Sequence, residues 1–242
     1  MNIIKLSAIN STNDYLKSLS SGQYVENFTI VVAEHQTNGK GQMGAKWDTA
    51  PGKNLTFSVL IKDLLLEINE IFNLNAAVAV SIVQALKKFN IPDLGIKWPN
   101  DILAGNKKIG GVLIENSIKK DGEIFSIVGI GINVNQLDFD DLPKASSLAV
   151  ITGKEYDKLA ILEAIAENLL RNVSALLNKD ADAIWDRYHK KLYKKGKPMP
   201  FEQQDRKFMG IIQGVTKCGS LQLLLEDDSV AKFQIKEIQM LY

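Results

Sequence analysis

The chain has 242 residues, of which 45% are hydrophobic and 24% are charged, and its formal net charge is +1. Such a composition supports a packed core in one sizeable domain plus a small second one, and it excludes a chain-wide attraction to nucleic acid or to an anionic membrane. The apolar runs are shorter than the roughly 20 residues that span a bilayer, and one cysteine with two histidines argues against a disulfide framework or a zinc enzyme, so we expect a cytoplasmic protein.

The N-terminal quarter is predicted to contain a helix, two strands and one long loop. Residues 11–19 have amphipathic spacing and begin with Ser-Thr-Asn, which could cap a helix. Residues 28–35 and 55–61 are rich in β-branched and apolar residues, as strands are. The polar stretch between these strands contains four glycines, and a loop of that length inside a compact domain is usually functional or disordered.

The middle of the chain alternates between long helices and strands. Apolar residues at helical spacing predict a helix over 68–89, which is apolar on most sides and should lie buried against a sheet, and a second helix over 156–177. Apolar runs between these helices predict strands at 95–98, 107–116 and 125–135. This order of elements indicates a sheet covered by helices.

The C-terminal part has a different pattern. After a lysine-rich stretch at 189–200, which we interpret as a solvated linker, the sequence changes to short strands with a hairpin turn at 226–229. The predicted strands are 208–215, 220–226 and 230–235. We therefore expect two domains, residues 1–190 and a small β-barrel at 195–242. Cys218 falls among these strands, where a small buried hydrophobic side chain is more ordinary than a nucleophile.

The glycine-rich stretch GKGQMG, residues 39–44, has the backbone freedom to fold its amides around an anion. It matches neither the phosphate-binding loop of NTPases nor the dinucleotide-binding fingerprint. Glycine spacing alone is therefore compatible with an ordinary mobile surface loop as well as with a ligand-binding loop.

The stretch KWPND, residues 97–101, is more specific. Pro99 restricts its own φ and biases Trp98 toward an extended conformation, so Lys97 leaves the strand on a stiff support. Asn100 and Asp101 can lock the following turn by hydrogen-bonding nearby backbone. A cation held this way suits the stabilisation of charge that develops in a reaction, and the ordinary alternative is a solvated lysine.

The stretch VGIGINVN, residues 128–135, places Gly129 and Gly131 in an otherwise apolar strand. Glycine at such positions indicates the close approach of another backbone or of a ligand. Asn133 and Asn135 alternate onto one face. A bent strand with a polar rim would have the same pattern, so the residues alone leave both interpretations open.

In chain order, five motifs resemble those of biotin–protein ligases. They are STN (11–13), EHQTNGKGQMGAKW (34–47), KWPNDIL (97–103), KKIGGVLIE (107–115) and GIGINVN (129–135). The resemblance extends over nearly the whole chain, and KWPND followed by KKIGGVLIE is its most specific part. It implies an α+β fold, in which helices flank a mixed sheet, with a small SH3-like β-barrel as the C-terminal domain.

The resemblance also implies an activity. Members of that family use ATP, with Mg²⁺ expected beside it, to convert biotin into biotinyl-5′-AMP and then transfer biotin to a specific lysine of a biotin carboxyl carrier protein. Lys97 corresponds to the catalytic lysine, which neutralises the biotin carboxylate and the α-phosphate as they approach. Trp47 would wall the biotin pocket, and Asn133 would lie near the adenine.

The site residues follow from the same correspondence. The implied biotin-binding residues are Ser11, Thr12, Asn13, Gln36, Gly39, Lys40, Gly41, Trp47 and Lys97. The implied ATP- and adenylate-binding residues are Lys40, Gly41, Gln42, Gly44, Asn100 and Asn133. No metal ligand can be assigned from the sequence, and neither a monomer nor a homodimer is favoured.

The sequence departs from the family pattern in its loop, where Lys40, Gln42 and Ala45 occupy the three usual arginine positions. Lysine lacks the bidentate fork of arginine, and glutamine lacks its charge, so we expect weaker retention of the adenylate. Because the STN motif begins at residue 11, we expect the short form without an N-terminal DNA-binding domain. The alternatives are a lipoate–protein ligase or octanoyltransferase and, much less favoured, a non-enzymatic nucleotide- or RNA-binding module using KKLYKKGK (190–197).

Overall fold

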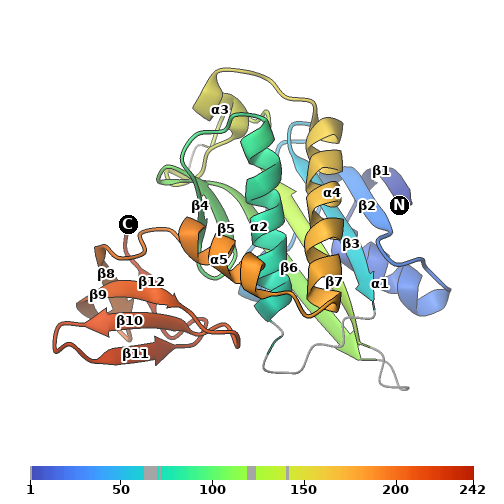
Figure 1. Ribbon diagram of the computed structural model, residues 1–242. Coiled ribbons are helices and arrows are strands. Elements are labelled where there is room, and N and C mark those ends of the chain that lie inside the picture. Colours follow the sequence, from blue (N-terminus) through green and yellow to red (C-terminus); the bar gives the residue numbers. More distant parts are fainter. Residues whose placement is uncertain (1, 63–69, 71, 119–123, 140–141) are drawn as a thin grey trace.

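The computed structural model describes residues 2–62, 70, 72–118, 124–139 and 142–242, and it has two sheets (Figure 1). Seven strands form a mixed sheet with helices on both faces, and five strands form an antiparallel sheet at the C-terminus. The predicted α+β class with a mixed sheet is confirmed, and the second sheet is consistent with an SH3-like domain. No helix in the described part of the chain is long and apolar enough to cross a membrane.

The seven-stranded sheet has the order β1-β2-β3-β7-β6-β5-β4. Its strands are β1 (Ile3–Ile9), β2 (Ile30–Gln36), β3 (Leu55–Lys62), β4 (Leu94–Lys97), β5 (Asp101–Ala104), β6 (Lys107–Ile118) and β7 (Ile124–Ile132). β1 runs parallel to β2, and the other neighbours are antiparallel. The five strands expected in this part of the chain are all present, and β1 and β5 are additional.

The helices are α1 (Thr12–Gly22), α2 (Phe72–Lys88), α3 (Leu148–Thr152), α4 (Lys158–Leu177) and α5 (Asp182–Lys191). The three long helices expected from the sequence are present, with Ser11 capping α1 by accepting a hydrogen bond from the Asp14 N–H at 3.4 Å. The first four residues predicted for α2 include three, 68, 69 and 71, that lie outside the described residues. α3 and α5 were not predicted.

The two faces of the large sheet carry different helices. Alternate strand residues such as Ile30, Val59 and Val128 belong to the main core, which α2 and α4 cover side by side (Figure 1). Their neighbours Val31 and Leu60 belong to a smaller core with Leu16 of α1. Since successive residues of a strand point to opposite faces, α1 lies on the face opposite to α2 and α4.

Register places small residues in the middle of the α1 face. Directly opposite residues of an antiparallel pair share a face, so two rows run across β2, β3, β7 and β6. The rows are Val31, Ser58, Gly129 and Leu113, and then Ala33, Thr56, Gly131 and Gly111. The second row has almost no side-chain volume, and this leaves room for other groups above the sheet.

The C-terminal sheet is antiparallel, in the order β11-β10-β9-β8-β12. Its strands are β8 (Pro198–Gln203), β9 (Arg206–Val215), β10 (Leu221–Leu225), β11 (Val230–Phe233) and β12 (Gln239–Met240). The rings of Phe201, Phe208 and Phe233 stack at centroid distances of 5.9 Å. The Trp98 Nε1–H donates to the Gly219 carbonyl at 2.9 Å, and this buried bond joins the second sheet to the first.

One expectation about this part of the chain is wrong, and another holds only in part. Cys218 is exposed, because Gly219, with φ of +93°, turns the chain between β9 and β10 and presents Cys218 outward. Hydrogen bonds from the Thr216 and Ser220 hydroxyls lower the pKa of its thiol to about 7. The stretch 190–197 is only partly solvated, because its lysines are mostly exposed while Leu192 and Tyr193 are buried and the Tyr193 N–H donates to the Ile96 carbonyl at 2.8 Å.

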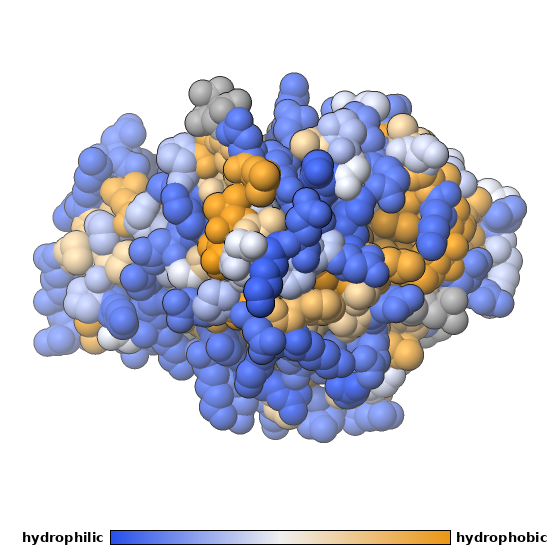
Figure 2. Space-filling view, turned by 90° about the horizontal axis from the view of Figure 1, so that it is seen from above, coloured by the Kyte–Doolittle hydropathy of each residue, from blue (hydrophilic) through white to orange (hydrophobic). Residues whose placement is uncertain are grey.

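Seen from above, the surface is largely hydrophilic, and its apolar side chains gather in a few recessed areas (Figure 2). The large apolar residues that are well exposed, such as Tyr24 and Leu137, lie apart in the chain rather than in one continuous stripe.

Candidate active site

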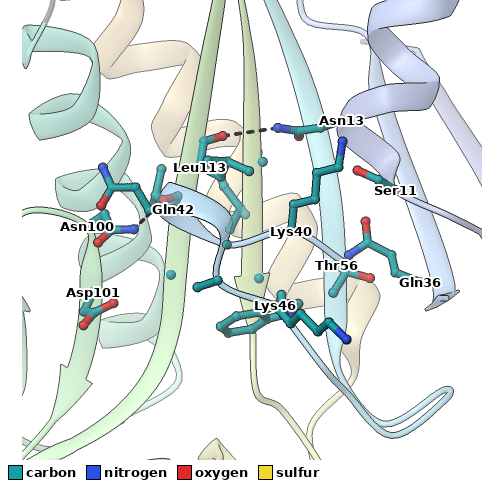
Figure 3. A pocket seen from close by; sticks show the side chains of 18 of the residues that line it. Ser11, Asn13, Gln36, Lys40, Gln42, Lys46, Thr56, Asn100, Asp101 and Leu113 are labelled. Carbon is teal, nitrogen blue, oxygen red and sulfur yellow. Dashed lines mark hydrogen bonds between the residues drawn. The ribbon is translucent and has the colours of Figure 1, made fainter. Parts of the chain in front are cut away.

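A cavity of about 330 Å³ lies on the α1 face of the large sheet. Its floor is the middle of β6 and β7, and its sides are the start of α1, the 36–54 loop and the KWPND turn. Ser11, Asn13 and Gln36 lie on one side and Asn100 and Asp101 on the other, with the loop carrying Lys40 across the front (Figure 3). We call this the first cavity.

A hydrogen-bonded group of buried residues lines one end of the first cavity. The Gln36 Oε1 accepts from the Thr12 backbone N–H at 2.8 Å and from the Thr12 hydroxyl at 3.0 Å. The Ser58 hydroxyl lies 2.7 Å from the Thr12 hydroxyl oxygen. The Gln36 carbonyl oxygen is thus used twice by the protein, and its amide Nε2, which hydrogen-bonds none of the described residues, can donate to a ligand.

Asn13, expected to bind biotin, belongs to the same hydrogen-bonded group and lines the first cavity. Its Oδ1 accepts from the Ser58 hydroxyl at 2.6 Å, and its Nδ2 donates to Glu115 Oε2 at 2.7 Å. The amide lies directly over Gly129, where a Cβ would come within 2.5 Å of Oδ1. Both ends of the amide are therefore engaged by protein, and Asn13 holds the polar end of the cavity in place.

Trp47 covers the second glycine. A Cβ at position 131 would lie 2.5 Å from the indole, so only glycine permits the ring to lie on β7. The close approach expected at Gly129 and Gly131 is thus made by two side chains, those of Asn13 and Trp47. The Trp47 Nε1–H is buried and has no acceptor among the described residues. A buried donor without a partner is unusual and indicates a place for a ligand acceptor.

A second cavity of about 640 Å³ lies on the other side of Trp47. It shares Lys46, Trp47 and Lys108 with the first cavity, and its remaining wall includes Phe139 and Leu142. Asn133, expected near the adenine, lies here rather than in the first cavity, and its Nδ2 donates to the Ser146 carbonyl at 3.0 Å. The two cavities together can hold a ligand with two unlike ends.

The lysine of KWPND is paired rather than free. Lys97 Nζ lies 3.2 Å from one oxygen of Asp101, and Lys108 Nζ lies 2.6 Å from the other. The carboxylate is 13% exposed and lines the first cavity, whereas Lys97 lines a smaller cavity with Trp98 and Pro99. The Tyr242 ring stands 5.1 Å from Lys97 Nζ, and burial, followed by the charge of Asp101, raises the pKa of its phenol to about 12.

The glycine loop is closed on itself by backbone hydrogen bonds. The Trp47 N–H donates to the Gly39 carbonyl at 2.9 Å, and the Gly41 N–H donates to the Ala45 carbonyl at 2.7 Å. A Cβ on Gly39 would lie 2.3 Å from the Trp47 carbonyl oxygen, so that position requires glycine. Lys40 Nζ pairs with Asp14 at 2.7 Å, and the hydrogen bond to this carboxylate raises the pKa of Lys40.

Most of the expected site residues line the first cavity. They are Ser11, Thr12, Asn13, Gln36, Lys40, Gly41, Gln42, Trp47 and Asn100. Gly39 and Gly44 support the loop without lining the cavity, Lys97 lines a smaller cavity and pairs with Asp101, and Asn133 lies in the second cavity. Sequence reasoning did not identify Ser58, Lys108, Glu115 or the C-terminal residues that reach the site. Lys108 and Glu115 stand in KKIGGVLIE, so the motif was noticed but its side chains were given no roles.

Comparison with known proteins gives one family. The profile described as "Biotin/lipoate A/B protein ligase family" matches residues 6–135, more than half of the chain. The "Bifunctional ligase/repressor BirA" of Bacillus spizizenii is 36% identical over 168 residues, covering 67% of this chain and 51% of the relative. The "Biotin--[acetyl-CoA-carboxylase] ligase" of Mycobacterium tuberculosis is 30% identical over 169 residues, covering 68% and 60%.

The chain thus spans about half to three fifths of the length of these two curated relatives. A solved structure matches over its full extent. The biotin protein ligase from Aquifex aeolicus, in complex with biotin and ATP, superposes with a TM-score of 0.83 at 28% identity, covering 99% of this chain and 98% of that one.

Proposed function

The chain belongs to the biotin/lipoate A/B protein ligase family, and on that premise we propose that it is an ATP-dependent biotin–protein ligase. It would form biotinyl-5′-AMP and then biotinylate a lysine of a biotin carboxyl carrier protein. The relatives named as biotin ligases and the Aquifex structure bound to biotin and ATP support this proposal. The observation that carries it is the pair of adjoining cavities that share Trp47 and Lys108.

The first cavity suits the biotin head group. That head is a neutral urea, which needs donors for its carbonyl and acceptors for its N–H groups, and its ring sulfur and chain are apolar. The hydroxyls of Ser11 and Thr12 and the free Nε2 of Gln36 provide the polar partners at one end. Trp47 provides an apolar wall, and Gly111 and Gly131 keep the floor open.

The second cavity suits the adenosine end. Its apolar wall of Phe139 and Leu142 can cover a purine, and the polar side chain of Asn133 lies in the same cavity. The phosphate would then lie at the shared wall, beside Lys46, Lys108 and the unpartnered Trp47 N–H. An anion there would meet two ammonium groups and one buried donor.

The proposed chemistry has two steps. A biotin carboxylate oxygen attacks the α-phosphorus of ATP, the bond to the β-phosphate breaks, and pyrophosphate leaves. The uncharged amine of the acceptor lysine then attacks the acyl carbon, and AMP leaves with the electron pair of the broken bond. Lys108 lines the first cavity and would bring positive charge to the place where the two anions must meet, and Lys97, which pairs with the same carboxylate of Asp101, would add to it, as a preorganised site requires.

Mg²⁺ would arrive with the ATP phosphates, whose charge it neutralises. Asp101 is the one carboxylate among the described residues that line the first cavity. The described residues contain no group of three or more histidine, cysteine, aspartate or glutamate side chains that could hold a metal without the nucleotide. Asp101 is therefore the side chain we assign to the vicinity of the ion.

We also propose that residues 1–190 form the catalytic domain and residues 195–242 the small C-terminal domain, in a cytoplasmic enzyme. The large sheet and α1 to α4 fall in the first range, α5 ends one residue beyond it at Lys191, and β8 to β12 fall in the second. The turn between β11 and β12 contributes Ile235 and Lys236 to the first cavity, so the C-terminal domain would take part in the site.

Pyrophosphate release tests the function directly. The full chain is incubated with ATP and Mg²⁺ together with either biotin or lipoate, and pyrophosphate is followed before a carrier domain is added. We expect release that depends on biotin, followed by a mass increase on the carrier lysine. Release with lipoate alone would assign the chain to the lipoate branch of the family, and release with neither would overturn the proposal.

A further inference from the structure

We infer that Lys236, on the turn between β11 and β12, binds the β- and γ-phosphates of ATP and stabilises pyrophosphate as it leaves. This inference rests on the proposed function and adds a residue of the second sheet to it. Three independent observations support it: where Lys236 lies, how its backbone is held, and which cations of the site already have partners.

The position of Lys236 is at the edge of the first cavity, on the side of the KWPND turn. It lines the first cavity together with Ile235, and it also borders a smaller cavity beside Lys97, Trp98 and Pro99. It therefore borders both the open space of the site and the smaller cavity that the predicted catalytic lysine lines. No other segment of the C-terminal sheet contributes described residues to the first cavity.

The backbone of this turn is well held. Lys236 has φ of +77°, a left-handed conformation that is uncommon for residues other than glycine and asparagine. The Glu237 N–H donates to the Gln234 carbonyl at 3.1 Å, and the Gln234 N–H donates to the Glu237 carboxylate at 2.7 Å. Ile238 is buried in the main core on the far side. The fixed turn presents one lysine to the cavity.

The ion pairs of the site leave the Lys236 ammonium available to bind an anion. The charged residues that line the first cavity are four lysines and one aspartate. Asp14 engages Lys40, and Asp101 engages Lys108. Lys46 and Lys236 make no ion pair with the described residues. The cavity thus has surplus positive charge, as a site for a polyanion should, and two of its cations are uncommitted.

The direction in which the leaving group departs indicates that Lys46 and Lys236 would bind different phosphates of ATP. Lys46 borders both cavities, so it lies where the α-phosphate joins the biotin and adenosine ends. In an in-line displacement the leaving group departs opposite to the attacking carboxylate, which comes from the Gln36 end. Asn100 and Asp101 line the side of the cavity opposite to Gln36 (Figure 3), and Lys236 also borders the smaller cavity beside the same KWPND turn. As the bond to the β-phosphate breaks, its electron pair goes to pyrophosphate, and Lys236 would stabilise that charge.

Two variants of Lys236 separate charge from backbone geometry. Lys236→Asn keeps a residue that tolerates positive φ and removes the ammonium, and Lys236→Arg keeps the charge. Lys232→Asn is the matched control, because Lys232 is an exposed lysine of the same sheet that lines neither cavity. Each full-length protein is assayed for the KM of MgATP, inhibition by inorganic pyrophosphate, and biotin binding by calorimetry without nucleotide.

For Lys236→Asn we expect the KM of MgATP and the inhibition constant of pyrophosphate to rise about 10- to 100-fold, the usual effect of losing one charged hydrogen bond. Biotin affinity should stay within about twofold, Lys236→Arg should recover most of the loss because it keeps the charge, and Lys232→Asn should behave like the wild type. Unchanged constants in Lys236→Asn would overturn the inference, as would a loss of biotin affinity that arginine does not restore, since that indicates a structural role.

The function and the inference fail in different ways. If the wild type releases pyrophosphate with biotin and Lys236→Asn does so with the same constants, only the inference is wrong. If the wild type forms no adenylate, direct binding of MgATP still decides the matter: weaker binding by Lys236→Asn than by Lys232→Asn supports the phosphate contact, and equal binding removes it.

Discussion

The floor of the first cavity consists of strand residues whose positions follow from register, whereas the loop above it is held by one exposed ion pair and a few backbone hydrogen bonds. Gly129 and Gly131 lie in the middle of a seven-stranded sheet, and each is covered by a side chain that leaves no space for a Cβ. Lys40 and Asp14, which tie the loop to α1, are both 44% exposed. The floor is therefore intolerant of substitution, and the loop can vary in charge without loss of fold.

The largest effect is expected at Lys97, which is the last residue of β4 and therefore belongs to the rigid sheet rather than to the loop. Lys97→Ala should lower the rate of adenylate formation about 100- to 1000-fold, because a preorganised cation at developing charge contributes that much. The change also leaves Lys108 paired with Asp101, so the fold should be retained. Pyrophosphate release and a thermal melt measure the two effects. A folded variant with near-normal release would remove Lys97 from the mechanism.

Gly131→Ala should follow, with a loss in kcat/KM for biotin of about 10- to 100-fold. The added methyl would lie 2.5 Å from the Trp47 indole and displace the wall that both cavities share, and small displacements of positioning groups are costly. Gly22→Ala, where a new Cβ meets no atom within 4 Å, is the control. Equal activity of the two variants would mean that Trp47 moves at no cost and that the floor is less rigid than we describe.

The loop should respond more mildly. Gln42 lines the first cavity from a short 3-10 turn, and an arginine there would offer the adenylate a charged donor, which is roughly twice as strong as a neutral one. Gln42→Arg should therefore slow the dissociation of preformed biotinyl-AMP about 3- to 10-fold. Filter binding with labelled biotinyl-AMP measures the rate. An unchanged or faster dissociation would show that the neutral residue is not the weak point of retention.

The smallest effect is expected at the ion pair of the loop. Asp14→Asn should change the KM of biotin by less than about threefold at low salt and not at all at 0.5 M salt, because exposed ion pairs contribute little and are screened. Steady-state assays at two salt concentrations test this. A loss as large as that of Gly131→Ala would place the loop among the rigid parts of the site.

The regular part of the fold could be predicted because its elements have long apolar patterns. The predicted helix over 11–19 and the strand over 55–61 are examples, since both end within a few residues of the observed α1 and β3. β1 begins with two adjacent isoleucines and alternates only in its later part, and β5 has four residues that follow the KWPND turn directly, so neither has a clear strand pattern. The exposure of Cys218 depends on the turn at Gly219 and was therefore missed.

The motifs that form the site could be predicted from the sequence, but the ion pairs between its residues could not. The KWPND motif indicated a lysine on a stiff support, and the sequence contains nothing to show that Asp101 would engage both Lys97 and Lys108. The contributions of Lys236 and Tyr242 depend on how the second sheet attaches, which is set by buried contacts such as the bond from Trp98 to Gly219. Local sequence carries no information about contacts between residues more than 100 positions apart.

The double pairing of Asp101 has a consequence for how the first cavity would accept an anion. A carboxylate with a single lysine partner would be left unpaired if that lysine turned to a phosphate, and an uncompensated buried charge is strongly unfavourable. Asp101 has two partners, Lys97 and Lys108. One of these ammonium groups could therefore turn to an incoming phosphate while the other stays paired with the carboxylate. Phosphate binding and release would then change only one of the two ion pairs at a time. Asp101 would keep a counter-ion throughout, and the lysine that had turned to the phosphate would pair with it again when the product leaves.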